Sequence, residues 1–371
     1  MSLIAFQQFA ARLRSFIDTR CHGARATPPK DERIVEFGSL ALGLFELQFE
    51  NNEAYRRFCE SRGVRPRDVG HWEEIPAIPS SAFKELELSV LPAGERTRAF
   101  HSSGTTLHRP SRHFHSRDSL ALYEASLASW FAPHLLPDAA SNPATSGPSA
   151  FLALTPRAAD APHSSLVHMF DAVARNWRWD TVEFCGHIGK GGDWELDTDS
   201  ASELLLRAQT AGRPVMLLGT AFSFVQLLDS LPGNRIQLPT GSRVMETGGY
   251  KGRSRTMPKQ ALHSALSERL RIPRENIVSE YGMSELSSQA YDRICGAPSN
   301  HVFRFPPWAR VQVISPETGQ EADEGQTGLL RIFDLANAFS VLAVQTEDLG
   351  TRRGDGFELL GRLPHSEPRG C

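Results

Sequence analysis

The sequence predicts an α/β fold in which helices flank a mostly parallel, doubly wound sheet. Apolar runs that suit buried strands alternate with segments of helical periodicity, such as residues 224–231. The strand-like runs lie at residues 150–154, 214–220, 243–245 and 276–278. Strands that alternate with helices are typical of a parallel sheet, whose ligands bind beyond the carboxyl ends of the strands. Residues 246–249 and 281–282 contain glycine and follow such strands, so we expect them to face a ligand.

The first part of the chain has a different pattern. Apolar residues recur there at helical spacing and predict a helical lead-in over residues 1–95. Residues 75–84 contain two prolines and predict a turn in which Ser80 or Ser81 caps a short helix.

Two later regions complete the prediction. Residues 116–131 have the pattern of an amphipathic helix, and residues 133–149 have the composition of an exposed loop. Short alternating strands separated by glycine-containing turns predict a small antiparallel β subdomain over residues 309–362. Residues 363–371 form a tail that ends on Cys371.

Bulk composition excludes several classes of protein. With 371 residues, of which 40% are hydrophobic, the chain can bury a large core. Its net charge of -3 argues against nucleic acid as a partner. The N-terminus lacks the basic and apolar regions of a signal peptide, and no apolar run has the length of a membrane span. We therefore expect a cytoplasmic protein without a membrane span.

The cysteines and histidines do not suggest a metal site. Five cysteines are scattered without a Cys-x-x-Cys pair, which fits free thiols in a reducing compartment and disfavours zinc. His113 and His115 flank Phe114 and would point together only on a strand. We expect them to form a pair on the surface.

A cluster of glycine and hydroxyl residues precedes the predicted sheet. It consists of Ser102, Ser103, Gly104, Thr105 and Thr106. Glycine lets the backbone N–H groups approach a phosphate closely, and hydroxyl groups add further donors. No Gly-Lys-Ser/Thr follows, so this is not the P-loop of kinases and GTPases. The segment is either a phosphate-binding loop or an ordinary polar turn.

Three more motifs follow this cluster in a characteristic order. They are Glu280-Tyr281-Gly282-Met283-Ser284-Glu285, Thr346-Glu347-Asp348 and Gly361-Arg362. The four motifs resemble the nucleotide-binding core of the adenylate-forming superfamily, whose members join a carboxylic acid to AMP. The resemblance implies that the chain is a single adenylation core, with its nucleotide-binding region at residues 96–308, and that ATP and Mg²⁺ are its cofactors.

The resemblance also implies roles for individual residues. In the motif that contains Gly282, Tyr281 would stack on adenine, Ser284 would contact the α-phosphate and Glu285 would bind Mg²⁺. A hard cation that bridges ATP oxygens usually takes only one or two protein carboxylates.

Other residues would bind the rest of the nucleotide. Asp348 would hold the ribose hydroxyls, and Arg362 matches the arginine at the end of the core domain. Gly248, Gly249 and Tyr250 occupy the place of the adenine-pocket segment.

The chain also departs from the superfamily pattern. Residues 107–112 replace the usual Gly and Pro-Lys, so that Arg109 or Arg112 would neutralise phosphate charge. Glu347 stands where the superfamily has glycine. No lysine follows Lys259, and we expect the superfamily's C-terminal lysine domain to be absent. The substrate carboxylate would then be oriented by Lys251, Arg253 or Lys84; alternatively Lys251, Arg253 and Arg255 are solvated surface residues.

One branch of the superfamily is similar over most of the chain: the LuxE-type acyl-protein synthetases of bacterial bioluminescence operons. The segments that carry this resemblance are residues 79–84, 102–106, 164–166, 218–220, 247–253, 280–286 and 369–371. Such proteins activate an acyl group with ATP and carry it on a cysteine near the C-terminus, which implies Cys371 here. An inert tail is the alternative for Cys371.

The resemblance predicts an enzyme that activates a fatty or aryl acid as its acyl-adenylate and transfers the acyl group to a protein cysteine thiol. The implied partners are the small carboxylic acid and an acyl reductase or other acyl-acceptor protein. Two alternatives stay open: an aryl or phenylacetate-type CoA ligase, and a degenerate nucleotide-binding scaffold without turnover.

Overall fold

The chain folds into two compact units, each of which combines segments that are distant in the sequence. The computed structural model describes residues 3–22, 30–102, 109–140, 147–231, 236–248, 257–298 and 301–363. Unit 1 comprises Met1–Trp130, Met283–Ala290 and Val302–Glu367, and unit 2 comprises Phe131–Gly282, Tyr291–His301 and Pro368–Cys371. The chain therefore passes from unit 2 to unit 1 within the predicted Tyr-Gly motif, between Gly282 and Met283.

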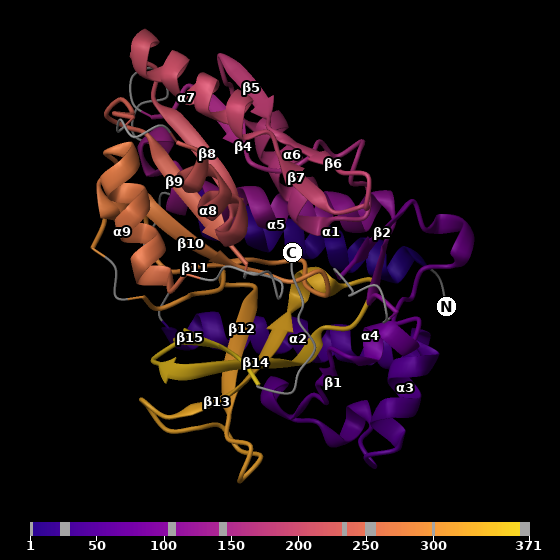
Figure 1. Ribbon diagram of the computed structural model, residues 1–371. Coiled ribbons are helices and arrows are strands. Elements are labelled where there is room, and N and C mark those ends of the chain that lie inside the picture. Colours follow the sequence, from indigo (N-terminus) through magenta and orange to yellow (C-terminus); the bar gives the residue numbers. More distant parts are fainter. Residues whose placement is uncertain are drawn as a thin grey trace. The chain divides into compact units, whose positions relative to one another are not determined.

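Unit 2 is built on the predicted parallel sheet, which is coloured from magenta to orange in Figure 1. Its parallel strands are β4 (Ala150–Ala153), β5 (Thr181–Phe184), β8 (Val215–Thr220), β9 (Arg243–Thr247) and β10 (Ile277–Tyr281). The order is β11-β10-β9-β8-β4-β5, where β11 is the two-residue strand Ala290–Tyr291. Because the chain leaves β4 first to one side and later to the other, the sheet is doubly wound, which confirms the predicted fold class.

Helices cover one face of this sheet with apolar side chains. They are α7 (Thr198–Ala211), α8 (Ala221–Ser230) and α9 (Lys259–Leu270), all in front of the strands in Figure 1. Leu205 of α7, Phe224 of α8 and Leu266 of α9 are fully buried in one core with Leu217 and Val244 of the strands. Every residue of β4, β8, β9 and β10 is buried, and burial on both faces of a sheet favours the continuous apolar runs that predicted these strands.

Two further elements belong to unit 2. Helix α6 (Ser165–Asn176) begins after Ser164, whose hydroxyl accepts the Val167 N–H at 3.2 Å. A small antiparallel hairpin of β6 (Gly186–Ile188) and β7 (Trp194–Leu196) follows β5. The sequence analysis did not predict this hairpin.

Unit 1 contains the second large sheet, drawn in orange to yellow in Figure 1. Strands β12 (Ala309–Ile314), β13 (Thr327–Asp334), β14 (Ala343–Arg353) and β15 (Gly356–Arg362) pair antiparallel and confirm the small antiparallel β region of the predicted fold. The division of the chain at residues 96, 309 and 363 stays a prediction.

One strand of this sheet comes from the predicted turn. β1 (Ile78–Pro79) pairs parallel with β14. The predicted short helix is α4 (Ala82–Glu85), and Ser81 is its N-cap residue without a side-chain capping bond. A two-residue strand has no periodicity to detect, because its position depends on a partner more than 260 residues away in sequence.

The first part of the predicted helical lead-in contains α1 (Leu3–His22), α2 (Lys30–Asn51) and α3 (Glu53–Glu60), and its extent over residues 1–95 stays a prediction. Gln48 of α2 is buried and forms hydrogen bonds with backbone groups just before β14. Its amide N–H donates to the carbonyls of Asn337 and Ala338, and its side-chain oxygen accepts the Leu342 N–H. Short 3-10 turns lie at η1 (Pro66–Asp68), η2 (Trp72–Glu74), η3 (Ala93–Glu95), η4 (Pro137–Ala140), η5 (Arg274–Asn276) and η6 (Leu335–Asn337).

The helix predicted over residues 116–131 is longer and more deeply buried than expected. α5 spans Arg117–Leu135, so the predicted exposed loop starts later than residue 133. Ser119, Ser126 and Ser129 are buried together with apolar residues of the helix, whereas Arg117 and Ala121 are exposed. Serine is polar in sequence, but its small side chain fits an interior position when its hydroxyl is hydrogen-bonded.

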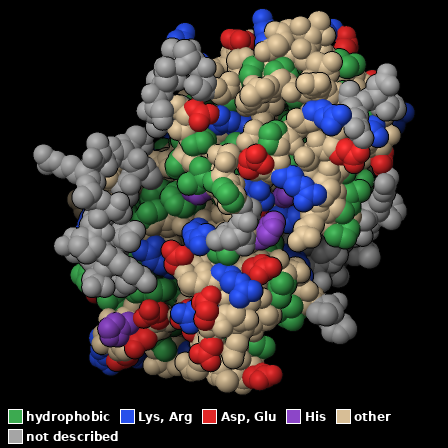
Figure 2. All heavy atoms as spheres, turned by 90° about the vertical axis from the view of Figure 1, so that its left-hand side faces the viewer, with side chains coloured by type: hydrophobic (Ala, Val, Ile, Leu, Met, Phe, Trp, Pro, Cys, Tyr) green, Lys and Arg blue, Asp and Glu red, His purple; other side chains and the backbone are tan. Residues whose placement is uncertain are grey.

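Among the described residues, no helix is both long enough and apolar enough to cross a bilayer. On the face shown in Figure 2, acidic and basic side chains lie interspersed among the described residues, as a net charge of -3 suggests.

Candidate functional site

Ser102, the first residue of the glycine and hydroxyl cluster, follows strand β2 (Arg98–His101) in unit 1. Strands β2 and β3 (Arg112–His115) pair antiparallel, and the pairing continues to Ser102 and Ser111. The Ser102 N–H donates to the Ser111 carbonyl at 3.3 Å, and the Ser111 N–H donates to the Ser102 hydroxyl at 3.0 Å. Ser102 is thus held at the point where the predicted phosphate loop begins. Ser103, Gly104, Thr105 and Thr106 lie outside the described residues.

Glu285, the predicted metal ligand, is buried beside this hairpin in unit 1. Its side chain accepts hydrogen bonds from the hydroxyls of Ser111 at 2.7 Å and Ser284 at 3.1 Å. Glu285 is 1% exposed, so the carboxylate is held in a pocket of hydroxyl donors. The structure therefore brings three predicted site residues, Ser102, Ser284 and Glu285, into one network, with Ser111 as the link that the sequence analysis missed.

The expectation of a surface histidine pair was wrong. His113 and His115 lie on β3 with ring centroids 4.2 Å apart, and they are 2% and 1% exposed. His113 Nδ1 lies 2.9 Å from the Ser284 carbonyl oxygen, which can only accept, so this nitrogen carries the proton. Burial lowers the pKa of His113 to about 4, against the effect of that hydrogen bond, and the imidazole is neutral near pH 7. The i, i+2 spacing on a strand was the signal for a shared face.

Residues in and next to η6 form hydrogen bonds that hold the backbone around Glu285. The Asn337 amide donates to the Glu285 carbonyl at 2.9 Å, and its oxygen accepts from the Ser287 hydroxyl at 2.7 Å. Asp334 accepts from the Ser287 N–H at 2.9 Å and from the Ser288 hydroxyl at 2.7 Å. Burial raises the pKa of Asp334, although these hydrogen bonds oppose the rise. The sequence analysis did not predict these hydrogen bonds, because they join residues about 50 positions apart in sequence.

Two other predicted site residues of unit 1 meet across neighbouring strands. Asp348 of β14 is paired with Arg362 of β15, and Arg362 Nε donates to the Asp348 carboxylate at 2.9 Å. Thr346 accepts the Asp348 N–H at 3.1 Å through its hydroxyl. Two separate sequence motifs are therefore parts of one local arrangement of a carboxylate and a guanidinium group.

The arginines and the lysine suggested as charge partners in unit 1 differ in their surroundings. Arg112 begins β3, and its guanidinium group lies 3.8 Å from the Glu87 carboxylate and 5.6 Å from the Phe114 ring centre. Arg109 is exposed. Lys84 lies on α4. Their roles toward phosphate or carboxylate stay predictions.

In unit 2, the predicted adenine-pocket residues follow two adjacent parallel strands. Gly248 comes directly after β9 with φ of 70°, a conformation that favours glycine, and Tyr281 ends β10. Thr247 and Glu280 face each other in the register, and the Thr247 hydroxyl donates to the Glu280 carboxylate. Gly248, Tyr281 and Gly282 thus lie at the carboxyl edge of the sheet, as expected for ligand-binding residues of this fold.

Behind this edge is a buried network of acidic and hydroxyl groups. Ser279 donates its hydroxyl to Glu246 at 2.6 Å, and His263 Nε2 of α9 lies 3.3 Å from the same Glu246 oxygen. Burial raises the pKa of Glu280 to about 7; the Thr247 hydrogen bond opposes the rise and the charge of Glu246 adds to it. Glu280 therefore titrates near neutral pH inside the fold.

The same network contains an ion pair. Asp292 accepts the Ser279 N–H at 2.8 Å and lies 3.2 Å from Lys259 Nζ. Burial tends to raise the pKa of Asp292, but the charges of Lys259 and Arg293 bring the net pKa below its ordinary value. This carboxylate stays ionised and fixes the backbone of β10 two residues before Tyr281.

Several predicted site residues lie outside the described residues: Gly249, Tyr250, Lys251, Arg253, Arg255 and Cys371. Their roles stay predictions. The described cysteines with assigned burial, Cys59, Cys185 and Cys295, are buried free thiols. Burial raises their pKa values to about 12, 12 and 11, so they are protonated near pH 7 and unsuited to nucleophilic attack.

The residues of unit 1 fit the predicted cofactors chemically. Ser102, Ser111, Ser284 and Glu285 offer only oxygen atoms, which are the ligands and neighbours that a hard cation such as Mg²⁺ prefers. One carboxylate is enough for a cation whose other ligands are phosphate oxygens and water. The carboxylate of Asp348 suits a ribose diol, and the guanidinium group of Arg362 suits phosphate.

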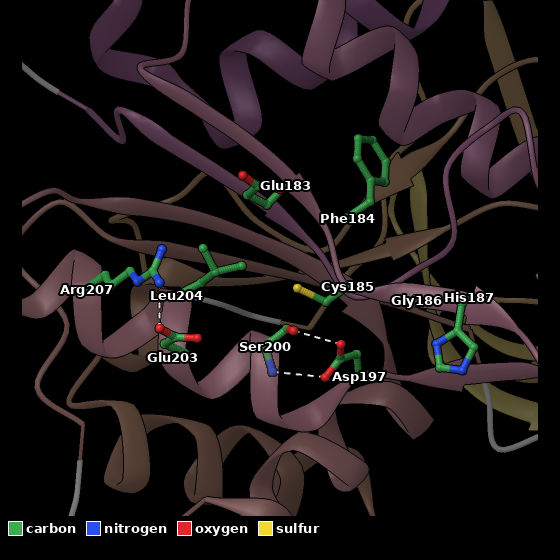
Figure 3. A pocket seen from close by; sticks show the side chains of 10 residues that line it. All are labelled: Glu183, Phe184, Cys185, Gly186, His187, Asp197, Ser200, Glu203, Leu204 and Arg207. Atoms are coloured by element: carbon green, nitrogen blue, oxygen red, sulfur yellow. Dashed lines mark hydrogen bonds and ion pairs between the residues drawn. The ribbon is translucent and has the colours of Figure 1, made fainter.

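The described residues also enclose a cavity of about 320 Å³ in unit 2 that lies away from these motifs. Figure 3 shows it between β5 and α7, with Glu183 and Phe184 on the strand and Ser200 and Glu203 on the helix. Asp197 accepts hydrogen bonds from both the N–H and the hydroxyl of Ser200, at 2.9 and 2.7 Å. No residue predicted from the sequence for the site lines this cavity.

The relatives of this chain are ligases, as the sequence motifs predict. No protein-family model matches the chain. A long-chain-fatty-acid–luciferin-component ligase of Vibrio harveyi is 24% identical over 355 residues, which cover 90% of this chain and 85% of the relative. The ligase of the same name from Aliivibrio fischeri is 22% identical over 350 residues, which cover 88% of this chain and 84% of the relative.

Solved structures share the fold. An open conformation of 2-hydroxyisobutyryl-CoA ligase in complex with 2-HIB-AMP and CoA has a TM-score of 0.60, with 13% identity, and covers 92% of this chain and 75% of its own. ATP-bound MatB from Rhodopseudomonas palustris has a TM-score of 0.50, with 17% identity, over 98% of this chain and 73% of its own. The chain thus has the fold of the adenylate-forming ligases. Together with the sequence similarity to the two ligases above, this fold confirms the predicted resemblance to the LuxE-type acyl-protein synthetases.

Proposed function

We propose that this protein is an ATP-dependent ligase that activates a carboxylic acid as its acyl-adenylate and transfers the acyl group to a protein cysteine thiol. The observation that carries the proposal is the similarity to two long-chain-fatty-acid–luciferin-component ligases over 90% and 88% of the chain. We infer a long-chain fatty acid as the first substrate to test, since both relatives are named for it.

The reaction has two steps. In the first, a carboxylate oxygen of the acid attacks the α-phosphorus of ATP, the bond to the β-phosphate oxygen breaks, and pyrophosphate leaves. In the second, a cysteine thiolate attacks the carbonyl carbon of the acyl-adenylate, and AMP leaves as the thioester forms. Both steps need positive charge and hydrogen-bond donors around the phosphate oxygens.

The residues of unit 1 would serve the phosphate end of ATP. Residues 102–106 would donate hydrogen bonds to the phosphates, Ser284 would contact the α-phosphate, and Glu285 would hold Mg²⁺. When bound, Mg²⁺ would neutralise charge on the phosphate oxygens. The burial of Glu285 and its two hydroxyl donors support this role, because they keep the carboxylate fixed in one place.

Other residues would bind the nucleoside and the acid. Asp348 would accept from the ribose hydroxyls, and Tyr281 with residues 248–250 would form the adenine pocket. Lys251, Arg253 or Lys84 would orient the carboxylate of the acid. Cys371 is the proposed acyl carrier, and the acyl-accepting partner would be a second protein that takes the acyl group from it.

An acid-dependent ATP–pyrophosphate exchange assay tests the first step. We expect exchange with a long-chain fatty acid and Mg·ATP, and no exchange when the acid is left out. A product analysis with and without CoA separates the alternatives: a CoA thioester would indicate a CoA ligase. Nucleotide binding without exchange for any fatty or aryl acid would indicate a scaffold and overturn the proposed activity.

A further inference from the structure

The hairpin of β2 and β3 makes a direct contact with Glu285 through one buried hydroxyl group. Ser111 is 1% exposed, and its Oγ donates to Glu285 Oε1 at 2.7 Å. The same residue is fixed through its backbone, since its N–H and its carbonyl oxygen are both bonded to Ser102. Every polar group of Ser111 is therefore engaged either with the first residue of the predicted phosphate loop or with the predicted metal ligand.

A second contact from the same strand fixes the backbone next to Glu285. His113 lies two residues after Ser111 and points to the same side of β3, because side chains alternate along a strand. Its Nδ1–H donates to the Ser284 carbonyl at 2.9 Å. The side chain of Glu285 and the backbone that precedes it are thus both held by this one strand.

These contacts are made by segments more than 170 residues apart in sequence, within unit 1. A hydroxyl that donates to a carboxylate leaves lone pairs on that carboxylate for a cation, and it fixes the direction in which they point. Groups that orient a metal ligand in this way typically change metal affinity by about 10-fold to 100-fold when they are removed.

We propose that Ser111 is a positioning residue that ties the Glu285 carboxylate to Ser102 and so sets the affinity of the protein for the divalent cation of Mg·ATP. The inference rests on the proposed function of Glu285 and names a residue that neither the motifs nor the comparisons assign. Ser111 itself is a buried donor to the ligand and does not contact the cation.

Direct metal binding tests this role. Mn²⁺ would be titrated by electron paramagnetic resonance into the full chain saturated with a non-hydrolysable ATP analogue, for the wild type, Ser111→Ala and Ser111→Thr. We expect Ser111→Ala to weaken Mn²⁺ binding about 10-fold to 100-fold, and Ser111→Thr to restore it to within about threefold, because threonine keeps the hydroxyl.

Two further variants make the comparison specific. Ser242→Ala removes an equally buried serine hydroxyl in unit 2, which accepts the Val215 N–H at 3.0 Å, and it should leave Mn²⁺ affinity unchanged. Glu285→Gln removes the carboxylate ligand itself, and its Mn²⁺ affinity shows how weak binding becomes when that ligand is lost. If Ser111→Ala fails to fold, Ser111→Cys takes its place, since a thiol has nearly the same shape and is only a weak donor.

The outcomes separate this inference from the proposed activity. Wild-type affinity in Ser111→Ala, or in Glu285→Gln, would overturn the positioning role even if the wild type catalyses pyrophosphate exchange. Weakened Mn²⁺ binding in both variants, with no exchange by the wild type for any acid, would support the role and overturn the proposed activity.

Discussion

At the scale of single residues, the account depends on the buried carboxylate of Glu285. It accepts from Ser111 and Ser284 within unit 1, and it comes two residues after the point where the chain enters that unit. The two hydroxyl donors and the surrounding protein hold this carboxylate in place.

Glu285→Gln should lower acid-dependent pyrophosphate exchange by about two orders of magnitude or more, because an amide oxygen is a poor substitute for a carboxylate ligand of Mg²⁺. The fold should be retained, since glutamine fits the same space. Exchange rates measured over a range of Mg²⁺ concentrations, together with urea unfolding of each protein, test both parts. Exchange at the wild-type level would show that Glu285 does not hold the metal.

Glu280 gives a prediction about pH. Its folded-state pKa of about 7 lies above its ordinary value of 4.5, so the folded state binds the proton more tightly than the unfolded chain does. The free energy of unfolding should therefore fall as the pH rises from about 4.5 to about 7, by up to about 3 kcal/mol. In Glu280→Gln this fall should be absent.

Unfolding by urea at several pH values between 4.5 and 8 measures this effect. The exposed Glu317 provides the control, since Glu317→Gln should keep the wild-type dependence on pH. A Glu280→Gln curve parallel to the wild type would mean that Glu280 is ionised throughout this range.

At the scale of elements, the sequence predicted the fold well wherever a strand or helix carries its own pattern. The parallel strands β4, β8, β9 and β10 are short and buried, and each overlaps an apolar run that the sequence analysis predicted as a strand. β9 and β10 end within the predicted motifs, at Thr247 and Tyr281. Their parallel direction follows from the alternation of strands with helices.

The elements that were missed or misjudged depend on partners far away in sequence. β1 forms by pairing with β14, and α5 places Ser119, Ser126 and Ser129 among its buried residues. His113 was assigned to the surface because an isolated histidine pair in a polar sequence gives no sign that its strand lies against the Glu285 segment. Composition and periodicity do not reveal such long-range burial.

The turn η6 carries an element-scale prediction. Asn337 donates to the Glu285 carbonyl and accepts from the Ser287 hydroxyl, both inside the protein. Asn337→Ala should lower the free energy of unfolding by about 1–3 kcal/mol, because a buried carbonyl and a buried hydroxyl lose their partners. It should also weaken the use of Mg²⁺.

Urea unfolding and Mg²⁺-dependent exchange would be measured in parallel for this variant. Asn51→Ala is a suitable comparison, because Asn51 donates to the carbonyl of Leu47 in its own helix and is less buried. A loss of stability in Asn337→Ala with an unchanged Mg²⁺ requirement would show that η6 supports the fold without affecting the site.

At the scale of the whole molecule, the proposal makes residue 371 the acyl carrier. The described cysteines with assigned burial are poor nucleophiles near pH 7 because their thiols are buried and protonated. Cys371→Ser should leave pyrophosphate exchange close to wild type and abolish a hydroxylamine-labile acyl label on the protein. A label that persists in this variant would move the acceptor to another residue.

The measurement that tests the central claim most directly is intact-protein mass spectrometry after incubation with Mg·ATP and a mixture of long-chain fatty and aryl acids. The account predicts a mass gain that equals one acyl group, requires ATP, and is lost after hydroxylamine treatment. An unchanged mass, with no pyrophosphate released for any acid, would contradict the assignment of this chain as an acid-activating acyl-protein ligase.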